Sequence, residues 1–426
     1  MKSNKKNKEQ WKKYNNLFET FAIELQENVT PKVSPPSGDQ DVQYGLELQQ
    51  NRLQKKGIRL EYQIEPRGHF GKQCPSKKSW CDEKYTNIMD YRTCHMTRSF
   101  HKENKRIYKE KQNIIFYQIS THTKNNPIID EDLYNCPHCD GVSKIKELKQ
   151  GCPYCDTRFK MDDLFPKVSN YFFIEEIGGT EKEVNRDIIK TIIPTMIITI
   201  ISCILYYYYH NPDLMGKLTN SIITGIIAGI VSGGFFGYII WAFKKILKIF
   251  AQAGKSMGMI IDTNGSSKRF VNQMKCYSSE FSYEYFSAKV VSLLKMILFS
   301  NNIKDLPICV EQIDKNNYSN VVDTQYVGAV ALKNFHIKNE YVYVTTNVYM
   351  DVWYENKGKI RKKREKFMVS LRKNITKPID FNFSIKKLQC NYCGGSFDAT
   401  KTRSCPYCST KYEFEEEDWI VVDLTK

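Results

Sequence analysis

Residues 191–209 read TIIPTMIITIISCILYYYY, residues 221–243 read SIITGIIAGIVSGGFFGYIIWAF, and neither stretch contains a charged residue. A helix needs about 20 apolar residues to cross the roughly 30 Å hydrocarbon layer of a bilayer, so both stretches are long enough. Soluble cores rarely hold two uncharged stretches of this length only eleven residues apart. Two buried core helices are therefore the less favoured interpretation. We expect a two-helix transmembrane hairpin over residues 188–245.

The lysine and arginine residues predict the orientation of this hairpin. Basic residues flank its outer ends, whereas the connecting loop, residues 210–220, carries only Lys217, opposed by Asp213. The positive-inside rule then places both termini in the cytoplasm, as expected of a multi-pass plasma-membrane protein. The N-terminal residues lack the apolar stretch of a signal peptide, so insertion is expected to depend on the internal segments. The flanking basic residues are Lys182, Arg186, Lys190, Lys244, Lys245 and Lys248.

Glycine recurs at every fourth residue of the second apolar stretch. Small residues at this spacing lie on one helix face and let a neighbouring helix approach closely. We expect the partner to be the first helix of the hairpin; the alternative is the same helix of a second copy, which would make a homo-oligomer. A third interpretation is the general tolerance of glycine in membrane helices. The residues are Gly225, Gly229, Gly233 and Gly237.

Eight of the fourteen cysteines form four Cys-x-x-Cys pairs, grouped two by two. Two such pairs at short distance supply four thiolates in a tetrahedron around one zinc ion. Four protein ligands leave no open position for water, so we expect two structural zinc ions in zinc ribbons at residues 131–170 and 387–420. A redox Cys-x-x-Cys motif is the alternative. The ligands are Cys136, Cys139, Cys152 and Cys155 in the first ribbon, and Cys390, Cys393, Cys405 and Cys408 in the second.

The two ribbons resemble each other beyond their ligands. Cys152-Pro-Tyr-Cys-Asp-Thr-Arg-Phe159 aligns with Cys405-Pro-Tyr-Cys-Ser-Thr-Lys-Tyr412, and acidic residues and an aromatic residue follow both. We interpret them as an internal duplication of one module on either side of the hairpin. A third site built from Cys74, Cys81, Cys94 and His95 matches no recognised ligand spacing, and reduced, partly buried thiols are the alternative.

The length and the charge of the chain limit the classes of protein to consider. A chain of 426 residues predicts two or three folded units, and the net charge of +16 favours anionic partners such as an acidic membrane face or nucleic acid. Residues 1–42 are expected to form a basic amphipathic helix, which lies on the membrane or docks on the protein itself, and then a linker rich in proline and serine. A β-rich cytoplasmic region with cysteines and histidines should follow over residues 43–130.

The region after the hairpin has the pattern of a helix followed by strands. Residues 277–300 are predicted to form an apolar helix, and residues 341–354 alternate between apolar and polar side chains, as a half-buried strand does. A turn at residues 356–359 leads to a partner strand with Phe367, Val369 and Leu371 on one side. The basic residues of this hairpin, and those after the second apolar stretch, predict contact with anionic lipid. The alternative is that the tip of the hairpin is simply solvated. In the hairpin the basic residues are Lys359, Arg361, Lys362, Lys363 and Arg364.

Residues 268–386 resemble the Tim-forty-four-like domain, the C-terminal part of a mitochondrial import-motor subunit that recurs in bacterial membrane proteins. The stretches FSYEYFSAKVVSLLKMILFS (281–300) and NEYVYVTTNVYMDVWYENKGK (339–359) carry this resemblance. The order of modules is also similar to an uncharacterised group of bacterial zinc-ribbon membrane proteins. The resemblance implies a cone-shaped α+β domain of the nuclear-transport-factor-two type with an apolar pocket. It does not extend to the chaperone-recruiting part of the mitochondrial protein, nor therefore to protein import.

The predicted fold class is therefore an α+β membrane protein with two zinc ribbons, a two-helix transmembrane hairpin and a cone-shaped cytoplasmic domain. The favoured function is an adaptor that binds protein partners at the cytoplasmic membrane face. A module that holds a lipid or an apolar small ligand is the main alternative. An enzyme is not expected, because the chain has no nucleophile motif, no phosphate-binding glycine loop and no open metal site. A nucleic-acid reader is not expected either, because residues 413–418 after the second ribbon are acidic.

Overall fold

The computed structural model divides into two compact units, one of residues 1–175 with 260–426 and one of residues 176–259. Each unit is described by itself. The described residues are 17–26, 36–66, 78–81, 84–124, 127–176, 181–210, 217–263, 266–279, 281–303, 306–310, 313, 318–376, 387–399, 401–412 and 418–426.

The unit of residues 176–259 consists of two long helices, α5 (Glu181–His210) and α6 (Lys217–Thr263, whose last residues belong to the other unit). Both are long and apolar enough to cross a membrane, over Asn185–His210 and Thr219–Ile246. Their most apolar windows are only 0% and 17% buried within the protein, unlike the core helix of a soluble domain. Two apolar helices are therefore present where the sequence predicted them.

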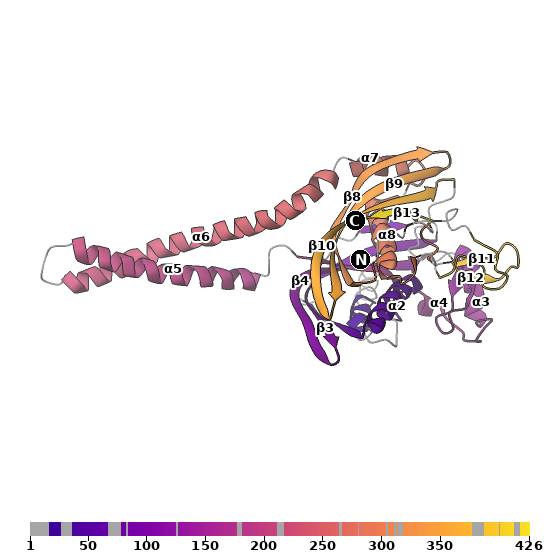
Figure 1. Ribbon diagram of the computed structural model, residues 1–426, viewed down its shortest axis with the longest axis horizontal. Helices are drawn as coiled ribbons and strands as arrows, with labels where there is room; N and C mark the ends of the chain where they lie inside the picture. Colours follow the sequence, from indigo (N-terminus) through magenta and orange to yellow (C-terminus); the bar gives the residue numbers. More distant parts are fainter. Residues whose placement is uncertain are drawn as a thin grey trace, which may run out of the picture. The chain divides into compact units, whose positions relative to one another are not determined.

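Helices α5 and α6 lie side by side (Figure 1), and the glycine stripe of α6 faces α5. A Cβ atom added at Gly229 would lie 2.4 Å from the Cα atom of Ile200, and the other three glycines of the stripe are similarly close to α5. The Thr199 hydroxyl donates a hydrogen bond of 3.0 Å to the carbonyl oxygen of Gly229. In contrast, Gly234 faces open space. The stripe thus serves the contact between the two helices of one chain.

The first half of the large unit, residues 17–175, is built on a sheet of five strands. The sheet has the order β1 (Ile58–Pro66), β3 (Tyr85–Lys102), β4 (Lys105–Thr123) and β7 (Lys167–Glu175), and β2 (Lys78–Cys81) also pairs with β3. Residues 17–26 form a helix, and α2 (Gln40–Lys55) precedes β1. Between β4 and β7 lie η1 (Pro127–Glu131), β5 (Leu133–Asn135), β6 (Val142–Lys144), α3 (Ile145–Gln150) and α4 (Met161–Leu164).

The second half, residues 266–426, has a sheet in the order β8 (Val321–Lys338), β9 (Tyr341–Asn356), β10 (Lys359–Asn374) and β13 (Ile420–Thr425). Helices α7 (Ser266–Met274) and α8 (Tyr283–Phe299) precede this sheet, and β11 (Lys387–Gln389) and β12 (Ser396–Asp398) lie between β10 and β13. The predicted helix and strand pair are confirmed, including the turn at Lys357 and Gly358. Phe367, Val369 and Leu371 are fully buried.

The two halves repeat one plan (Figure 1). Each has a helix, three antiparallel strands, a small ribbon and a fourth strand that returns to the sheet edge. The fourth strand also makes a parallel bridge in both halves, between Val168 and Gly38 and between Val421 and Cys309. The long hairpins turn through two positive-φ residues in each half, Glu103 and Asn104 or Lys357 and Gly358, as type I′ turns do. The duplication that the sequence predicted for the ribbons therefore extends to nearly the whole unit.

The helix of residues 17–26 docks on the protein itself. Phe18, Phe21 and Leu25 are 0–3% exposed, and the ring of Phe18 lies 5.1 Å from that of Phe116 on β4. The sequence left two alternatives for the predicted amphipathic helix: it lies on the membrane, or it docks on the protein itself. Residues 17–26 dock on the protein. The residues before 17 lie outside the described ones. Helix α2 (Gln40–Lys55), by contrast, lies mostly in the region that was predicted to be β-rich.

Candidate metal centres

All four Cys-x-x-Cys pairs adopt one tight turn. The first cysteine of each pair accepts a hydrogen bond from the backbone N–H four residues later, as Asp140 gives Cys136 and Ser409 gives Cys405. The residue after the second cysteine has a positive φ in every turn, which is where Asp, Asn and Gly are tolerated best. These four residues are Asp140, Asp156, Gly394 and Ser409.

The turns bring the predicted ligands together in two clusters of four. Within each cluster all four Sγ atoms lie within 4.8 Å of one another. The closest pairs are 3.7 Å apart in the first cluster and 3.6 Å apart in the second. Four sulfurs at about 2.3 Å from a central zinc ion would be about 3.8 Å apart, so both clusters fit tetrahedral zinc. Both four-cysteine sites are confirmed.

A threonine beside each cluster favours the thiolate that a metal requires. The Thr157 side chain hydrogen-bonds to Cys155 at 3.4 Å and lowers the pKa of that thiol to about 6. Thr410 does the same for Cys408 at 3.1 Å, and again the pKa falls to about 6. Because all four positions are taken by protein sulfur, each site suits a structural ion rather than a catalytic one.

The two ribbons lie beside each other. The Lys401 ammonium pairs with Asp140 at 2.5 Å, and Asn135 donates a hydrogen bond of 3.3 Å to Asp398. Burial and a hydrogen bond with Tyr407 raise the pKa of Tyr154.

Exposed tyrosines mark the tips of these turns. Tyr154 and Tyr407 each cover a glycine of their own ribbon, since a Cβ atom at Gly141 or Gly395 would lie 2.5 or 2.6 Å from the ring. Their side chains nevertheless remain 54% and 59% exposed, and Tyr392 is 81% exposed. We call these three residues the tyrosine surface. Its backbone is held by the cysteine turns, so the rings are presented on a rigid base.

The third set of candidate ligands does not converge. Cys94 is buried on β3, whereas His95, the next residue along the strand, is exposed and contacts Asn113. Cys81 pairs with Thr86, which is eight residues from Cys94 along β3, or about 26 Å at the rise of a strand. Cys74 lies outside the described residues. Among the residues that the structure does describe, only the two four-cysteine groups bring metal-binding atoms together.

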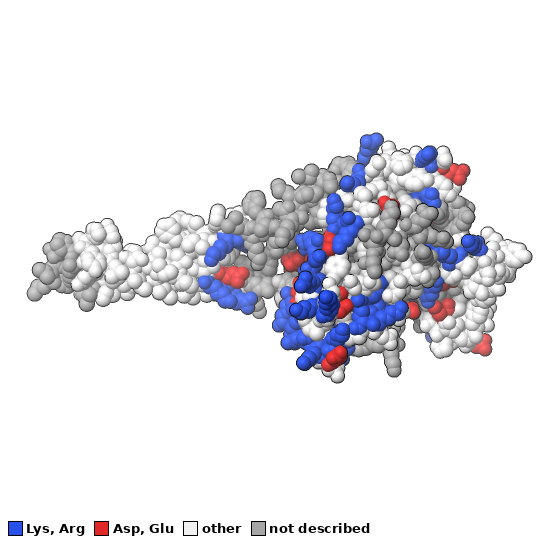
Figure 2. All heavy atoms as spheres, viewed as in Figure 1, with Lys and Arg blue, Asp and Glu red and all other residues white. Residues whose placement is uncertain are grey.

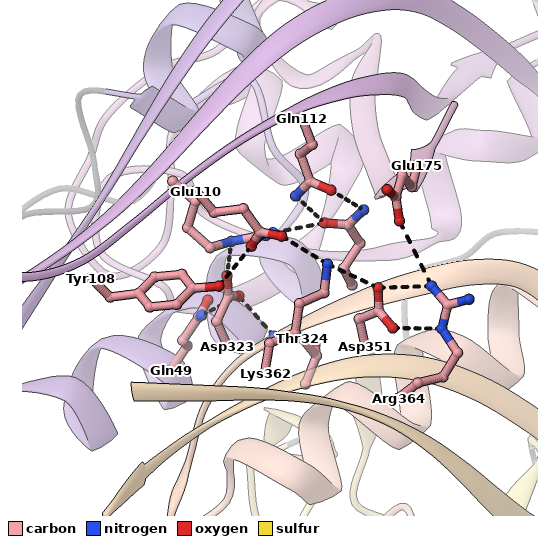
Figure 3. Close-up of polar contacts among 12 residues, drawn as sticks. Gln49, Tyr108, Glu110, Gln112, Glu175, Asp323, Thr324, Asp351, Lys362 and Arg364 are labelled. Atoms are coloured by element: carbon pink, nitrogen blue, oxygen red, sulfur yellow. Dashed lines mark hydrogen bonds and ion pairs between the residues drawn. The ribbon is translucent and has the colours of Figure 1, made fainter. Parts of the chain in front are cut away.

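A buried polar network joins the two halves (Figure 3). Arg98 of β3 is fully buried, and its Nε atom lies 2.7 Å from an Asp323 carboxylate oxygen on β8. Its guanidinium also lies 3.6 Å from the ring centre of Trp353. The Gln49 side chain donates a hydrogen bond of 2.9 Å to the other Asp323 oxygen. This set of contacts fixes the register between the halves, because misplacing it would leave a buried charge unpaired.

The network continues through charged residues of β4, β9 and β10. Lys362 lies 2.9 Å from Glu110 and 3.2 Å from Asp351, and Arg364 donates two hydrogen bonds of 2.7 and 3.1 Å to Asp351. Burial alone would raise the pKa of Asp351, but Arg364 and Lys362 outweigh it and hold this pKa below its ordinary value. Burial alone would lower the pKa of Lys362, but Asp351 and Glu110 raise it.

Two of the predicted lipid-contacting residues therefore have another role. Lys362 is half-buried and pairs with Asp351, and Arg364 pairs with the same carboxylate although it is exposed. Lys359, Arg361 and Lys363 are exposed. Successive side chains of a strand point to opposite faces, so Lys362 lies on the other face of β10 from Arg361 and Lys363. The sequence alone could therefore have indicated that Lys362 has a different role. Lys244 and Lys245 on α6 are exposed or half-buried, and the Lys248 side chain lies outside the described ones.

Arg52 of α2 makes a second contact between the halves. It is 2% exposed and donates to the carbonyl oxygens of Ser300 at 2.5 Å and Tyr318 at 2.6 Å. Its Nε atom also donates to the Asn301 side chain at 3.0 Å. Arg52 thereby satisfies backbone acceptors at the C-terminal end of α8, where a helix leaves carbonyl groups unpaired. Nothing in the local sequence of α2 indicates this role.

The interior of the second half is occupied by side chains. Val342, Val344 and Val348 of β9 are 0–1% exposed and belong to one cluster with Phe286 and Leu294 of α8. The resemblance implied an apolar pocket between this helix and this sheet. These side chains pack together between α8 and the sheet, and the fold is α+β as predicted.

No family model, no curated protein and no solved structure matches this chain. The resemblance to the Tim-forty-four-like domain gains no support from these comparisons. What the protein does must therefore be argued from the metal centres and the surfaces around them.

Proposed function

We propose that this protein is a membrane-anchored adaptor whose zinc ribbons bind a protein partner at the cytoplasmic face of the membrane. Helices α5 and α6 form the anchor, and the lysine and arginine asymmetry around them orients both termini to the cytoplasm. Two structural zinc ions hold the ribbons. The observation that carries the proposal is the tyrosine surface on the paired ribbons.

Three features support protein binding at this surface. Tyrosine is enriched at protein interfaces, because it combines a large apolar ring with a hydroxyl group and has few torsion angles to immobilise. The rings stand on turns fixed by the metal sites, so little ordering entropy is lost on binding. Closed four-cysteine sites leave no ligand position for a substrate, which favours a binding role over catalysis.

The anchor is tested first. Alkaline carbonate should leave the protein in the membrane pellet, and a reporter fused after Lys426 should be active only in its cytoplasmic form. Release by carbonate would reject the anchor, and activity of an export-dependent reporter at Lys426 would reverse the orientation. Elemental analysis of protein purified under reducing conditions should give two zinc ions per chain.

The tyrosine surface is tested by photo-crosslinking in cells. A photoreactive amino acid at Tyr392 should give a discrete cross-linked product of defined mass. The matched control is Tyr277, which is 46% exposed after α7, away from the ribbons. The product should disappear when Tyr154 and Tyr407 are both replaced by serine in a protein that still holds two zinc ions. Identical products from Tyr392 and Tyr277 would reject this surface as the binding site.

A further inference from the structure

The tips of the two long hairpins lie beside each other in the large unit, and Figure 2 shows lysine and arginine side chains gathered in this region. Ile360 beside the second tip belongs to the same buried cluster as Phe100 beside the first, and the Lys362–Glu110 pair joins β10 to β4. Exposed basic residues follow both tips. They are Lys105, Arg106 and Lys109 in the first half and Lys359, Arg361 and Lys363 in the second, and we call them the basic edge.

The charge of this edge is not neutralised by its neighbours. None of the six residues pairs with a carboxylate among the described residues. The closest carboxylates within the strands are already engaged: Glu110 with Lys362, Glu355 with Lys56, and Glu365 with Lys426, each at 2.9 Å. Glu103, in the turn of the first tip, is exposed and adds one negative charge beside the six positive ones. The edge therefore presents a positive field to whatever lies outside the unit.

The proposed membrane anchor follows this unit closely in the sequence. Strand β7 runs antiparallel to β4, from Lys167 beside Thr121 to Glu175 beside Ile114. It therefore runs in the direction of the β3–β4 tip and ends beside the middle of β4. Helix α5, the first apolar helix, begins at Glu181, six residues after Glu175 in the sequence.

Helix α6 extends beyond its apolar window. The apolar window of α6 ends at Ile246, but the helix continues to Thr263, which adds 17 residues or about 25 Å.

We propose that the basic edge binds the anionic headgroups of the membrane in which α5 and α6 are anchored. Tethering raises the effective concentration of that surface for the edge, which nucleic acid in solution does not share. Clusters of lysine and arginine close to a membrane helix are the usual readers of acidic lipid. The inference rests on the proposed anchor, but not on the ribbons or their partner.

The test uses the full chain in nanodiscs of phosphatidylcholine alone or with phosphatidylglycerol. Hydrogen exchange of residues 100–110 and 355–364 should slow in the anionic discs only, and 0.5 M salt should abolish the difference. K359E/R361E/K363E and K105E/R106E/K109E should each weaken flotation of neutral-disc protein with anionic vesicles by about tenfold or more.

The matched control is K275E/K333E/K338E, which makes the same charge change at exposed residues of the turn after α7 and of β8. Zinc content verifies that every variant is folded. Carbonate extraction measures membrane insertion, which does not depend on the charge of the lipid. Equal exchange in the two kinds of disc, or equal loss of flotation in the control, would overturn the proposal. Displacement of the anionic vesicles by equimolar single-stranded RNA would also overturn it and assign the edge to nucleic acid.

Discussion

The two halves of the large unit share one plan but differ in how the ribbon is attached. Cys136 and Cys152 of the first ribbon lie in a separate small core with Ile145 and Leu148 of α3. Cys390 and Cys405 of the second ribbon belong instead to the main core of its half. A ribbon of this size has too few apolar residues to fold without help. The first ribbon is supported by helix α3, whereas the second ribbon packs into the main core of the second half.

Because the two ribbons are attached differently, the same cysteine-to-serine change should have unequal effects in the two ribbons. The loss of structure in the second half is the largest effect that we expect. Cys405→Ser should expose the second half, with rapid exchange and proteolysis reaching β10 and β13, because structural zinc sites contribute about 10–16 kcal/mol in small domains. Cys152→Ser should disorder only the first ribbon. Hydrogen exchange with peptide resolution measures both. Cys276→Ser, at an exposed thiol, is the control.

Each ribbon variant should retain one zinc ion, and membrane insertion should persist in both. Equal protection of β10 in the two variants would show that the second ribbon is as independent as the first.

The junction between the halves gives the next largest effect. Arg98→Met leaves Asp323 buried without its partner and should lower the free energy of unfolding by about 3–5 kcal/mol. The double variant Arg98→Met/Asp323→Leu should recover much of this loss, because no buried charge remains. Denaturant unfolding of detergent-solubilised protein measures both, and Arg106→Met at the exposed edge should be neutral. A neutral Arg98→Met would mean that the halves are held together without this network.

The inserted helices can be tested apart from the halves. Gly229→Leu should push α6 away from α5 and destabilise the helix pair by about 1–3 kcal/mol, as overpacking does. Gly234→Leu, at a glycine that faces open space, should have no effect. Hydrogen exchange of both helices in mixed micelles of rising SDS content reports the difference. A change in oligomeric state with an intact helix pair would instead point to contact between copies.

The smallest expected effect is a pH dependence of the junction. The pKa of Asp351 is lower in the folded protein than in the unfolded chain, so the folded state binds fewer protons near pH 4. Its contribution to stability is complete above the unfolded pKa and is lost as the pH falls through the lowered folded pKa. The stability curve of Asp351→Asn should therefore be flatter below pH 4 than that of the original protein. Parallel curves would contradict this assignment.

Local patterns predicted much of this structure. The cysteine spacing, the two apolar stretches and the alternation of residues 341–354 each involve neighbours in sequence, and each is found in the structure. The junction was missed because its partners are far apart: Arg98 and Gln325, which hydrogen-bond, are separated by 227 residues. The repeat of the halves was visible only in the ribbons, where cysteine chemistry constrains the sequence. The strands of the two sheets need only alternate, so their sequences differ.

The helices inserted between the halves have a consequence for biosynthesis. The ribosome must make residues 176–259 after finishing the first half, which takes roughly 4–17 s at about 5–20 residues per second. Throughout that interval the face that will meet the second half is open to water. Arg98, Glu110 and Gln112 on that face can be hydrated until the second half has been synthesised. A wholly apolar face would instead expose the nascent chain to aggregation. The charges buried in the finished protein thus suit the order in which its parts are made.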